Sequence, residues 1–320
     1  MIVAIHADAG PAVGLGHVMR CTGLALALRR RGMLPVLLNA AGDALTAWFT
    51  RHALAELRCA DNPEALIQAA RRAGAALLVA DSYRLDRLAL RRAGGELKLA
   101  WFDDTAQAPL AADAIINGSP AARTLPYALP ATVLALLGPA YQVVRPGLTA
   151  RSRRGPVRRL LVTYGGADPW NVGPRLAALL PPDIVADFVV GPFADIPANL
   201  PAHAVPHKAP ADMAPLIDRA DLAVSAGGQT LFELAAAKLP TIAFGLGKDQ
   251  GPTLEWLGRA GAIAFAGWAD DTGLDQALRH HLDGLIKDEP ARLLLAERAH
   301  ALVDGQGADR IAAALSGLLA

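Results

Sequence analysis

The sequence predicts an α/β protein with two Rossmann-like domains in tandem, each built on a parallel sheet. The chain has 320 residues, about twice the size of a common domain. Short apolar runs alternate with longer segments of helical periodicity, and this alternation occurs twice. Strands that are apolar throughout, with helices between them, indicate a parallel sheet covered on both faces. A basic stretch marked by proline and glycine, residues 144–156, separates the two series and is the predicted linker.

In the first domain, residues 1–148, five apolar runs are expected to form strands. These are residues 2–7, 35–38, 76–80, 97–102 and 114–116. Four segments have the pattern of helices: residues 17–31, 45–52, 63–73 and 85–93. Because crossovers between parallel strands are right-handed, this order predicts a doubly wound sheet.

The second domain, residues 156–320, repeats the rhythm. Strands are expected at residues 159–163, 184–190, 222–225, 241–244 and 262–265. Helices are expected at residues 172–180, 210–219, 230–238, 252–260, 273–286, 289–303 and 309–319. Two such domains are expected to face a common cleft with the carboxyl edges of their sheets, where ligands bind in open α/β folds.

Composition and charge indicate an ordinary globular protein. Hydrophobic residues make up 53% of the chain, and the 31 basic residues nearly balance the 30 acidic ones. The net charge of +1 gives no electrostatic reason to expect nucleic acid as a partner. The chain opens on an apolar strand without a basic leader, and no apolar run reaches the roughly 20 residues that span a bilayer. Its two cysteines cannot form a disulfide framework, which favours a reducing compartment, and we expect a cytoplasmic protein. We also expect a monomer without a membrane span.

A glycine-rich loop at residues 8–17 leads from the first strand directly into a helix. Gly14 and Gly16 allow a tight turn and a close approach of the backbone to a ligand. The start of the helix offers free N–H groups and positive partial charge, which suit an anion. His17 lies on the first turn, where the same partial charge disfavours a protonated imidazole and leaves a base that can accept a proton. The alternative is that His17 only caps a helix. The third glycine of a dinucleotide fingerprint is missing, which disfavours a nicotinamide cofactor.

Polar residues also follow the next strands of the first domain. Asp81-Ser82-Tyr83 combines a carboxylate, a hydroxyl and a phenol, a set that suits the hydroxyls of a sugar but also an ordinary turn. Asp103 and Asp104 end the following strand. Either could orient His17 or bind substrate, and one of them is expected to be a helix cap.

In the second domain, glycine pairs follow two strands. Gly165 and Gly166 form a turn whose amides could cradle a diphosphate. Ala226, Gly227 and Gly228 lead into another helix start, again a candidate anion site. Glu233 follows Thr230 at the spacing of a capping box, so the two could simply cap the helix. Alternatively, the Glu233 carboxylate accepts hydrogen bonds from the ribose hydroxyls of a nucleotide.

A last polar loop carries Asp249 and Gln250 after the strand at residues 241–244, in position for a sugar or a phosphate. No metal site is predicted. Prolines deny a helix to His203 and His207, and the adjacent His280 and His281 lack partners.

Together these segments resemble the UDP-sugar hydrolases of pseudaminic acid biosynthesis. Residues 14–20 match their G-x-G-H-x-x-R signature, and the similarity covers nearly the whole chain. It continues in the family's order through residues 81–83, 102–104, 137–141, 165–169 and 225–228. The Gly-Gly-x-x-x-x-Glu pattern that ends at Glu233 is shared with a broader relative, the peptidoglycan N-acetylglucosaminyltransferase.

The resemblance implies a GT-B fold and hydrolysis of UDP-2,4-diacetamido-2,4,6-trideoxy-β-L-altropyranose to free sugar and UDP, without a metal or other cofactor. It implies that His17 activates water, which attacks the anomeric carbon with inversion. It places Arg20 and Tyr83 at the substrate and Glu233 at the ribose. One position departs from the family, which has Asn-Gln where this chain has Asp249-Gln250. An ionised Asp only accepts hydrogen bonds and would repel a diphosphate. Either Asp249 therefore faces N–H or hydroxyl donors of the sugar, or the substrate differs from the family's usual one. The alternatives are a glycosyltransferase on the same scaffold and a nucleotide-binding module without catalytic activity.

Overall fold

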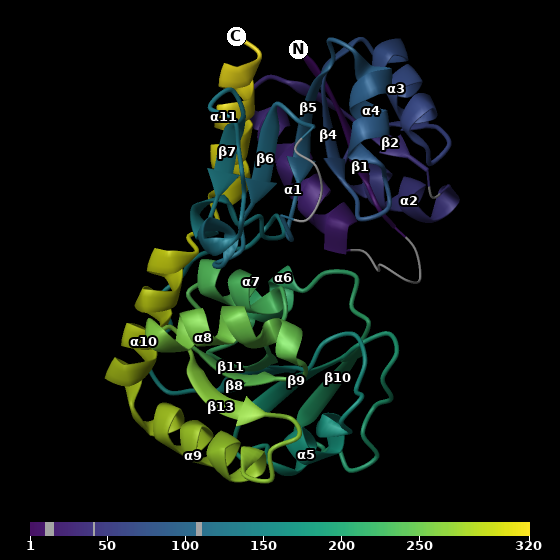
Figure 1. The fold of residues 1–320 in the computed structure, drawn as a ribbon. Coiled ribbons are helices and arrows are strands. Elements are labelled where there is room, and N and C mark those ends of the chain that lie inside the picture. The colour runs from purple at the N-terminus through teal and green to yellow at the C-terminus, as the bar shows by residue number, and fades with distance from the viewer. Residues whose placement is uncertain (10–15, 41, 107–110) are drawn as a thin grey trace. The chain divides into compact units, whose positions relative to one another are not determined.

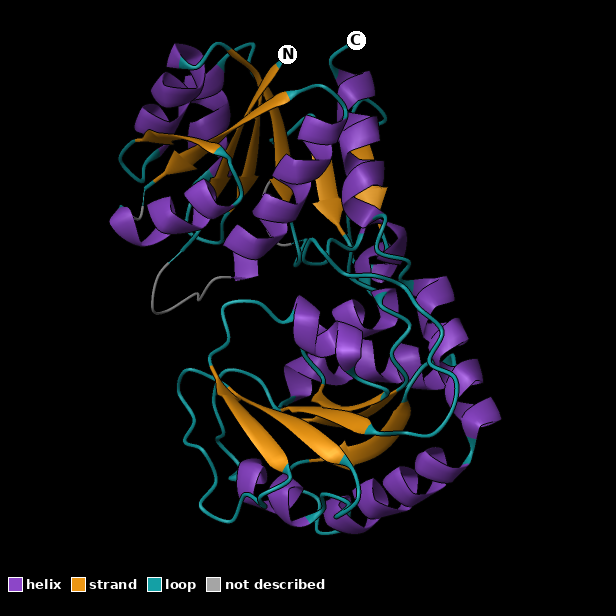
Figure 2. Ribbon diagram, turned by 180° about the vertical axis from the view of Figure 1, so that it is seen from behind, coloured by secondary structure: helices purple, strands orange, loops and turns teal. Residues whose placement is uncertain are grey.

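The chain forms two compact units in a computed structural model that describes residues 1–9, 16–40, 42–106 and 111–320 (Figure 1). Unit 1 comprises Met1–Pro146 and Gln306–Ala320, and unit 2 comprises Gly147–Gly305. Each unit has its own parallel sheet, with helices on both faces (Figure 2). Among the helices within these ranges, none is both long and apolar enough to span a bilayer.

The sheet of unit 1 has seven strands in the order β3-β2-β1-β4-β5-β6-β7, all of them parallel. They are β1 (Ile2–Ala7), β2 (Leu34–Asn39), β3 (Ala55–Arg58), β4 (Ala75–Asp81), β5 (Lys98–Phe102), β6 (Ala114–Asn117) and β7 (Leu134–Leu137). The five predicted strands are confirmed. β3 and β7 were not predicted, because they are four-residue strands at the two edges and β3 carries charged residues.

The helices of unit 1 begin and end close to the predicted positions. They are α1 (Gly16–Arg30), α2 (Asp43–Arg51), α3 (Pro63–Arg72), α4 (Arg87–Gly94) and α11 (Gly307–Leu318), with short 3-10 turns η1 (Ala122–Thr124) and η2 (Pro139–Tyr141). Side-chain caps define two of these starts. The Asn62 side chain accepts the N–H of Ala65 at α3, and Asp86 accepts those of Leu88 and Ala89 at α4.

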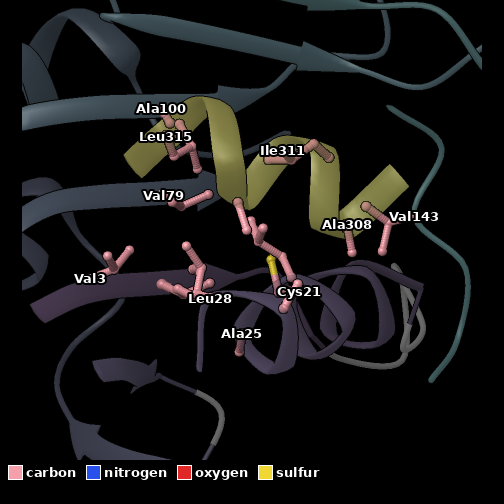
Figure 3. Close-up of a cluster of buried hydrophobic side chains, with 14 of the residues drawn as sticks. Val3, Cys21, Ala25, Leu28, Val79, Ala100, Val143, Ala308, Ile311 and Leu315 are labelled. Atoms are coloured by element: carbon pink, nitrogen blue, oxygen red, sulfur yellow. The ribbon is translucent and has the colours of Figure 1, made fainter. Parts of the chain in front are cut away.

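The last helix corrects the predicted domain boundary, which placed residues 156–320 in one domain. α11 packs on α1, where Ile311 and Leu315 join Cys21 and Leu28 in the core of unit 1 (Figure 3). A side chain at Gly307 would lie 2.1 Å from the backbone oxygen of Gln142, so glycine is needed for this close approach. The amphipathic pattern predicts a helix with a buried face, but that pattern does not identify the sheet that the face covers.

Unit 2 has a six-stranded parallel sheet in the order β10-β9-β8-β11-β12-β13. The strands are β8 (Arg159–Thr163), β9 (Val185–Val190), β10 (Ala204–Lys208), β11 (Leu222–Ala226), β12 (Thr241–Gly245) and β13 (Ala264–Trp268). The helices are α5 (Val172–Ala178), α6 (Ala214–Arg219), α7 (Thr230–Ala236), α8 (Gly251–Arg259), α9 (Leu274–Lys287) and α10 (Glu289–Leu302), with η3 (Lys248–Gln250). β10 was not predicted, because it contains Pro206, which a sheet tolerates at its edge.

The boundary between the units falls inside the basic stretch predicted as a linker, and the stretch from Gly147 onward is part of unit 2. The buried Arg153 guanidinium donates hydrogen bonds to the backbone oxygens of Ile217, Ala220 and Ala237. Ala220 and Ala237 are the C-caps of α6 and α7, where free carbonyls and negative partial charge favour a cation. A run that looks like a solvated linker in sequence therefore fixes the start of unit 2.

Candidate functional site

Polar side chains of unit 1 converge at the carboxyl ends of β1, β4 and β5. β1 pairs with β2 on one side and with β4 on the other, so the strand order reverses between β1 and β4. Ligands of open α/β sheets bind at such a reversal. The N–H of Asp8, after β1, donates to the backbone oxygen of Asp81 at the end of β4, at 2.9 Å. This bond joins the two strand ends on which the candidate site is built.

His17 and Asp81 form a buried pair at this point. Nδ1 of His17 lies 2.6 Å from Oδ1 of Asp81, whose side chain is 1% exposed. An ionised carboxylate can only accept, so Nδ1 carries a proton, and the neutral tautomer of this imidazole has its lone pair on Nε2. Within the ranges that the structure describes, Nε2 has no hydrogen-bond partner. α1 begins at Gly16, and this places His17 on its first turn as predicted. Gly14 lies outside the described residues.

Arg20 holds this carboxylate and a second one. Its Nε and Nη2 donate to the two oxygens of Asp81 at 2.8 and 2.7 Å, and Nη1 and Nη2 donate to Asp104 at 2.9 and 3.0 Å. Its guanidinium also lies over the ring of Phe102, 4.6 Å from the centroid. Burial favours a neutral Asp81, but the Arg20 charge and the hydrogen bonds of His17 and Arg20 outweigh it and keep the pKa of Asp81 below its usual value. Asp81 is therefore a fixed anion behind His17.

Tyr83 completes the network from the loop after β4. Its hydroxyl donates to Oδ2 of Asp104 at 2.7 Å. Its ring meets the His17 imidazole edge to face, with centroids 4.8 Å apart. The Tyr83 side chain is 59% exposed, so one surface of the ring remains open to a ligand. Burial and the Asp104 charge raise the pKa of Tyr83, which remains a neutral donor at physiological pH.

The structure corrects the assignment of the residue that orients His17. The candidates from sequence were Asp103 and Asp104, but the contact is made by Asp81. Asp103 is buried in an ion pair with Arg87 at 2.8 Å and accepts the N–H groups of the turn that follows. The physical reason is the strand order. β4 lies beside β1, whereas β5 is one strand farther away.

Asp8 is a site residue that the sequence analysis did not single out. It is fully buried, and its Oδ2 accepts the N–H of Tyr83 at 3.0 Å. Asp8 therefore holds the loop that carries Tyr83. The available signal was a carboxylate at the end of the first strand, two residues after His6 and on the same face.

In unit 2, the predicted residues lie at the carboxyl ends of β8, β11 and β12. Gly165 has a positive φ of 89°, which glycine adopts without strain, and a Cβ there would lie 3.8 Å from Leu246. A Cβ at Gly227 would lie 2.9 Å from Oε1 of Gln250, so these two loops pack closely. Side chains added at Gly166 or Gly228 would meet nothing within 4 Å. The backbone at those two glycines is open to a ligand.

The remaining predicted residues of unit 2 differ in exposure. Glu233 is 4% exposed on α7, and this helix begins at Thr230 after Gln229, whose side chain forms no capping bond. Thr230 is therefore not the cap residue that a capping box with Glu233 would require. Ala226 is buried at the end of β11, and Asp249 is exposed. Oε1 of Gln250 accepts the N–H of Leu246 at 2.9 Å and so shapes its own loop.

Trp170 was also missed by the sequence analysis. Its indole N–H donates to the backbone oxygen of Leu246 at 2.8 Å, and its side chain is 46% exposed. Asp168 positions this segment by accepting the N–H groups of Val172 and Gly173 at the start of α5. Trp170 therefore links the turn after β8 to the loop after β12. An exposed tryptophan near a glycine turn was the available signal.

Comparisons with known proteins agree with this architecture. No family model matches the chain. The chain is 27% identical to the spore coat polysaccharide biosynthesis protein SpsG of Bacillus subtilis (strain 168), over 99% of this chain and 98% of that protein. Among solved structures, it resembles the spinosyn forosaminyltransferase SpnP with a TM-score of 0.71 at 14% identity, covering 100% of this chain and 99% of that one. MurG of Acinetobacter baumannii gives a TM-score of 0.67 at 14% identity, with 99% of both chains covered. The MnaA structure of S. aureus with UDP gives 0.62 at 12% identity, covering 99% and 96%. The two tandem Rossmann-like domains thus have the GT-B fold.

Proposed function

We propose that this chain is an enzyme that acts on a nucleotide-linked sugar and hydrolyses a UDP-linked diacetamido-trideoxy sugar to free sugar and UDP. The observation that carries the proposal is the His17–Asp81 pair at the strand reversal, where Nε2 of His17 has no hydrogen-bond partner in the described part of the chain. The names of the similar proteins support the coarser part. SpsG is named for spore coat polysaccharide biosynthesis, SpnP is named as a forosaminyltransferase, and MnaA was solved with UDP.

In the proposed reaction, water attacks the anomeric carbon on the face opposite to UDP. A bond forms between the water oxygen and this carbon, while the bond to the phosphate oxygen of UDP breaks and its electron pair leaves with UDP. Nε2 of His17 takes the proton of the water, and the Asp81 carboxylate stabilises the imidazolium that results. The product is the sugar of inverted configuration. Binding both reactants beside the base removes much of the entropic cost of the step.

The neighbours of His17 have distinct roles in this proposal. Arg20 is a positioning residue, because its fork fixes the Asp81 carboxylate that orients the imidazole. The exposed face of Tyr83 contacts the sugar, and its hydroxyl holds Asp104 toward Arg20. No step needs a metal, since the leaving group is a stable diphosphate.

Unit 2 supplies the nucleotide site in this proposal. The open backbone at Gly166 and Gly228 lets a diphosphate approach closely enough to accept N–H hydrogen bonds. The Glu233 carboxylate accepts hydrogen bonds from the ribose hydroxyls. Asp249, exposed in the last loop, accepts from N–H or hydroxyl donors of the sugar.

A glycosyltransferase is the second candidate, because SpnP and other proteins of this fold are named as transferases. The two activities differ in whether an acceptor is needed. Incubation of the chain with UDP-diacetamido-trideoxy sugars alone, followed by NMR that resolves the anomers, separates them. Hydrolysis predicts free sugar, first seen as the inverted anomer, together with an equal amount of UDP. An intact donor that is consumed only when an acceptor sugar is added would establish a transferase. UDP binding without turnover in either assay would establish a non-catalytic module.

A further inference from the structure

His6 is a buried imidazole without a hydrogen bond. It lies near the end of β1 and is 1% exposed, and neither of its ring nitrogens has a hydrogen-bond partner among residues 1–9, 16–40, 42–106 and 111–320. Buried polar groups are nearly always paired, because an unpaired one loses its hydration without compensation. A ligand that accepts the lone pair of an imidazole nitrogen would remove this cost.

Two carboxylates face the Nε2 atom of His6. Oδ1 of Asp61 lies 3.4 Å away and Oδ1 of Asp8 lies 3.7 Å away. Asp8 follows the end of β1, two residues after His6, and Asp61 directly precedes Asn62, the cap residue of α3. The ligand atoms of the three residues all lie within 4.8 Å of one another.

We infer that His6, Asp8 and Asp61 form a binding site for a divalent transition metal of the zinc type. Imidazole nitrogens and carboxylate oxygens are both zinc ligands, and open zinc sites use three protein ligands with water in the remaining position. Zinc bonds of about 2.0–2.1 Å in tetrahedral geometry separate ligand atoms by about 3.4 Å. The His6–Asp61 and His6–Asp8 separations are close to that value. The four histidines weighed as metal ligands from the sequence, at positions 203, 207, 280 and 281, lie in unit 2 and are unrelated to this cluster.

Arg84 is the cation that pairs with the two carboxylates of this cluster. Its Nη2 donates to Oδ1 of Asp8 at 3.2 Å and to Oδ2 of Asp61 at 2.7 Å. The Arg84 side chain is 54% exposed, so it can swing into solvent and release both carboxylates. Arg84 bonds to the two carboxylates and forms no hydrogen bond with His6, whereas a metal can bind all three side chains. Arg84 and the metal are competing cations.

Asp8 uses its two carboxylate oxygens separately. Oδ2 of Asp8 stays on the N–H of Tyr83 while Oδ1 faces the cluster. The metal would thus be bound beside the proposed reaction centre and would brace the Tyr83 loop without taking part in the chemistry.

The test is metal binding by the full chain, independent of any activity. The protein is freed of metal with a chelator and titrated with Co²⁺, whose visible absorption reports nitrogen and oxygen ligands. Zn²⁺ is then used to displace it. We expect one Co²⁺ per chain. Arg84→Ala is expected to tighten binding by about tenfold, because it removes the competing cation. Asp61→Ala is expected to weaken binding by about tenfold or more, since one of three ligands is lost.

Matched controls distinguish the cluster from adventitious binding. Arg92→Ala and Glu64→Ala remove exposed charges of unit 1 outside the cluster and should leave the affinity unchanged. His6→Phe preserves bulk and should abolish the absorption band, and Asp61→Ala provides the same test if His6→Phe does not fold. Absence of a Co²⁺ band in both the wild type and Arg84→Ala would overturn the inference. A band that survives Asp61→Ala but is lost in His17→Ala would also overturn it.

Discussion

His17 and Asp81 are joined by a 2.6 Å contact between Nδ1 and a carboxylate oxygen, although 64 positions separate them in the chain. The contact follows from the strand order, because α1 is the helix that follows β1 and Asp81 ends β4, the strand beside β1. It fixes the imidazole so that Nε2, and not Nδ1, is available as a base.

Asp81→Asn should impair catalysis far more than nucleotide binding. An amide at this position can present its NH₂ to the imidazole and favour the wrong tautomer, and it cannot stabilise an imidazolium. We expect kcat to fall by about two orders of magnitude or more, with an unchanged Kd for UDP. Asp103→Asn is the matched control, because Asp103 is a buried carboxylate at the next strand end that pairs with Arg87. Steady-state kinetics and calorimetry measure both quantities, and comparable losses in the two variants would refute the assigned role of Asp81.

Arg20→Gln should destabilise unit 1 in addition to slowing turnover. Arg20 neutralises Asp81 and Asp104 together, and its removal leaves the buried Asp81 charge with His17 and the weak thiol donor of Cys21. Breaking a buried ion pair from one side costs about 3–5 kcal/mol, and the partial exposure of Arg20 and Asp104 reduces this to about 2–3 kcal/mol. Urea unfolding followed by circular dichroism measures the loss. A loss no greater than that of Arg92→Gln, an exposed arginine of the same unit, would contradict the account.

Acid should unfold the protein through its buried carboxylates. Asp187 is a buried residue of β9 that accepts hydrogen bonds from Arg159 and Arg219. The pKa values of Asp81, Asp103 and Asp187 are lowered, because their cationic partners outweigh the burial that opposes ionisation. Each therefore stabilises the fold above the usual carboxylate pKa of 3.8. That contribution is lost as pH falls through the lower folded value. We expect the Tm of the wild type to fall steeply below a pH of about 4. Asp187→Asn should have a lower Tm than the wild type at pH 7, and its Tm should fall less steeply in acid, because one of the ionised carboxylates is already absent. Equal slopes for wild type and variant would contradict this prediction.

Gly166→Ala and Gly228→Ala should weaken UDP binding without changing stability. A methyl group at either position meets no protein atom within 4 Å, so the fold tolerates it. If a diphosphate lies against this backbone, the methyl group displaces it, and we expect Kd to rise by about tenfold or more. Gly273→Ala, which is equally unhindered but precedes α9, is the control. Calorimetry with UDP and thermal unfolding measure the two effects. Unchanged affinity in both test variants would exclude these glycines from the nucleotide site.

The sequence predicted the parts of the fold that apolar periodicity encodes. The buried strands β1, β4, β8 and β11 lie where their apolar runs indicate. The short edge strands β3 and β10 were missed, because half-exposed strands carry polar residues and proline.

Residue pairings could not be obtained from the sequence in the same way. Asp81 and not Asp103 or Asp104 meets His17, since that choice follows from strand order, which local pattern does not encode. The glycine-histidine motif predicted the base, but its partner needed the three-dimensional arrangement. The same holds for α11, whose apolar face packs on α1 in unit 1.

The central claim is that His17 is the base that activates water, and turnover of His17→Ala tests it most directly. The measurement is kcat for release of free sugar from the UDP-linked substrate, alongside Kd for UDP from calorimetry on the same samples. General-base catalysis contributes about two to four orders of magnitude. The account predicts a kcat reduced by about a hundredfold or more, with UDP affinity within about twofold of the wild type. A variant that keeps near-wild-type turnover would contradict it.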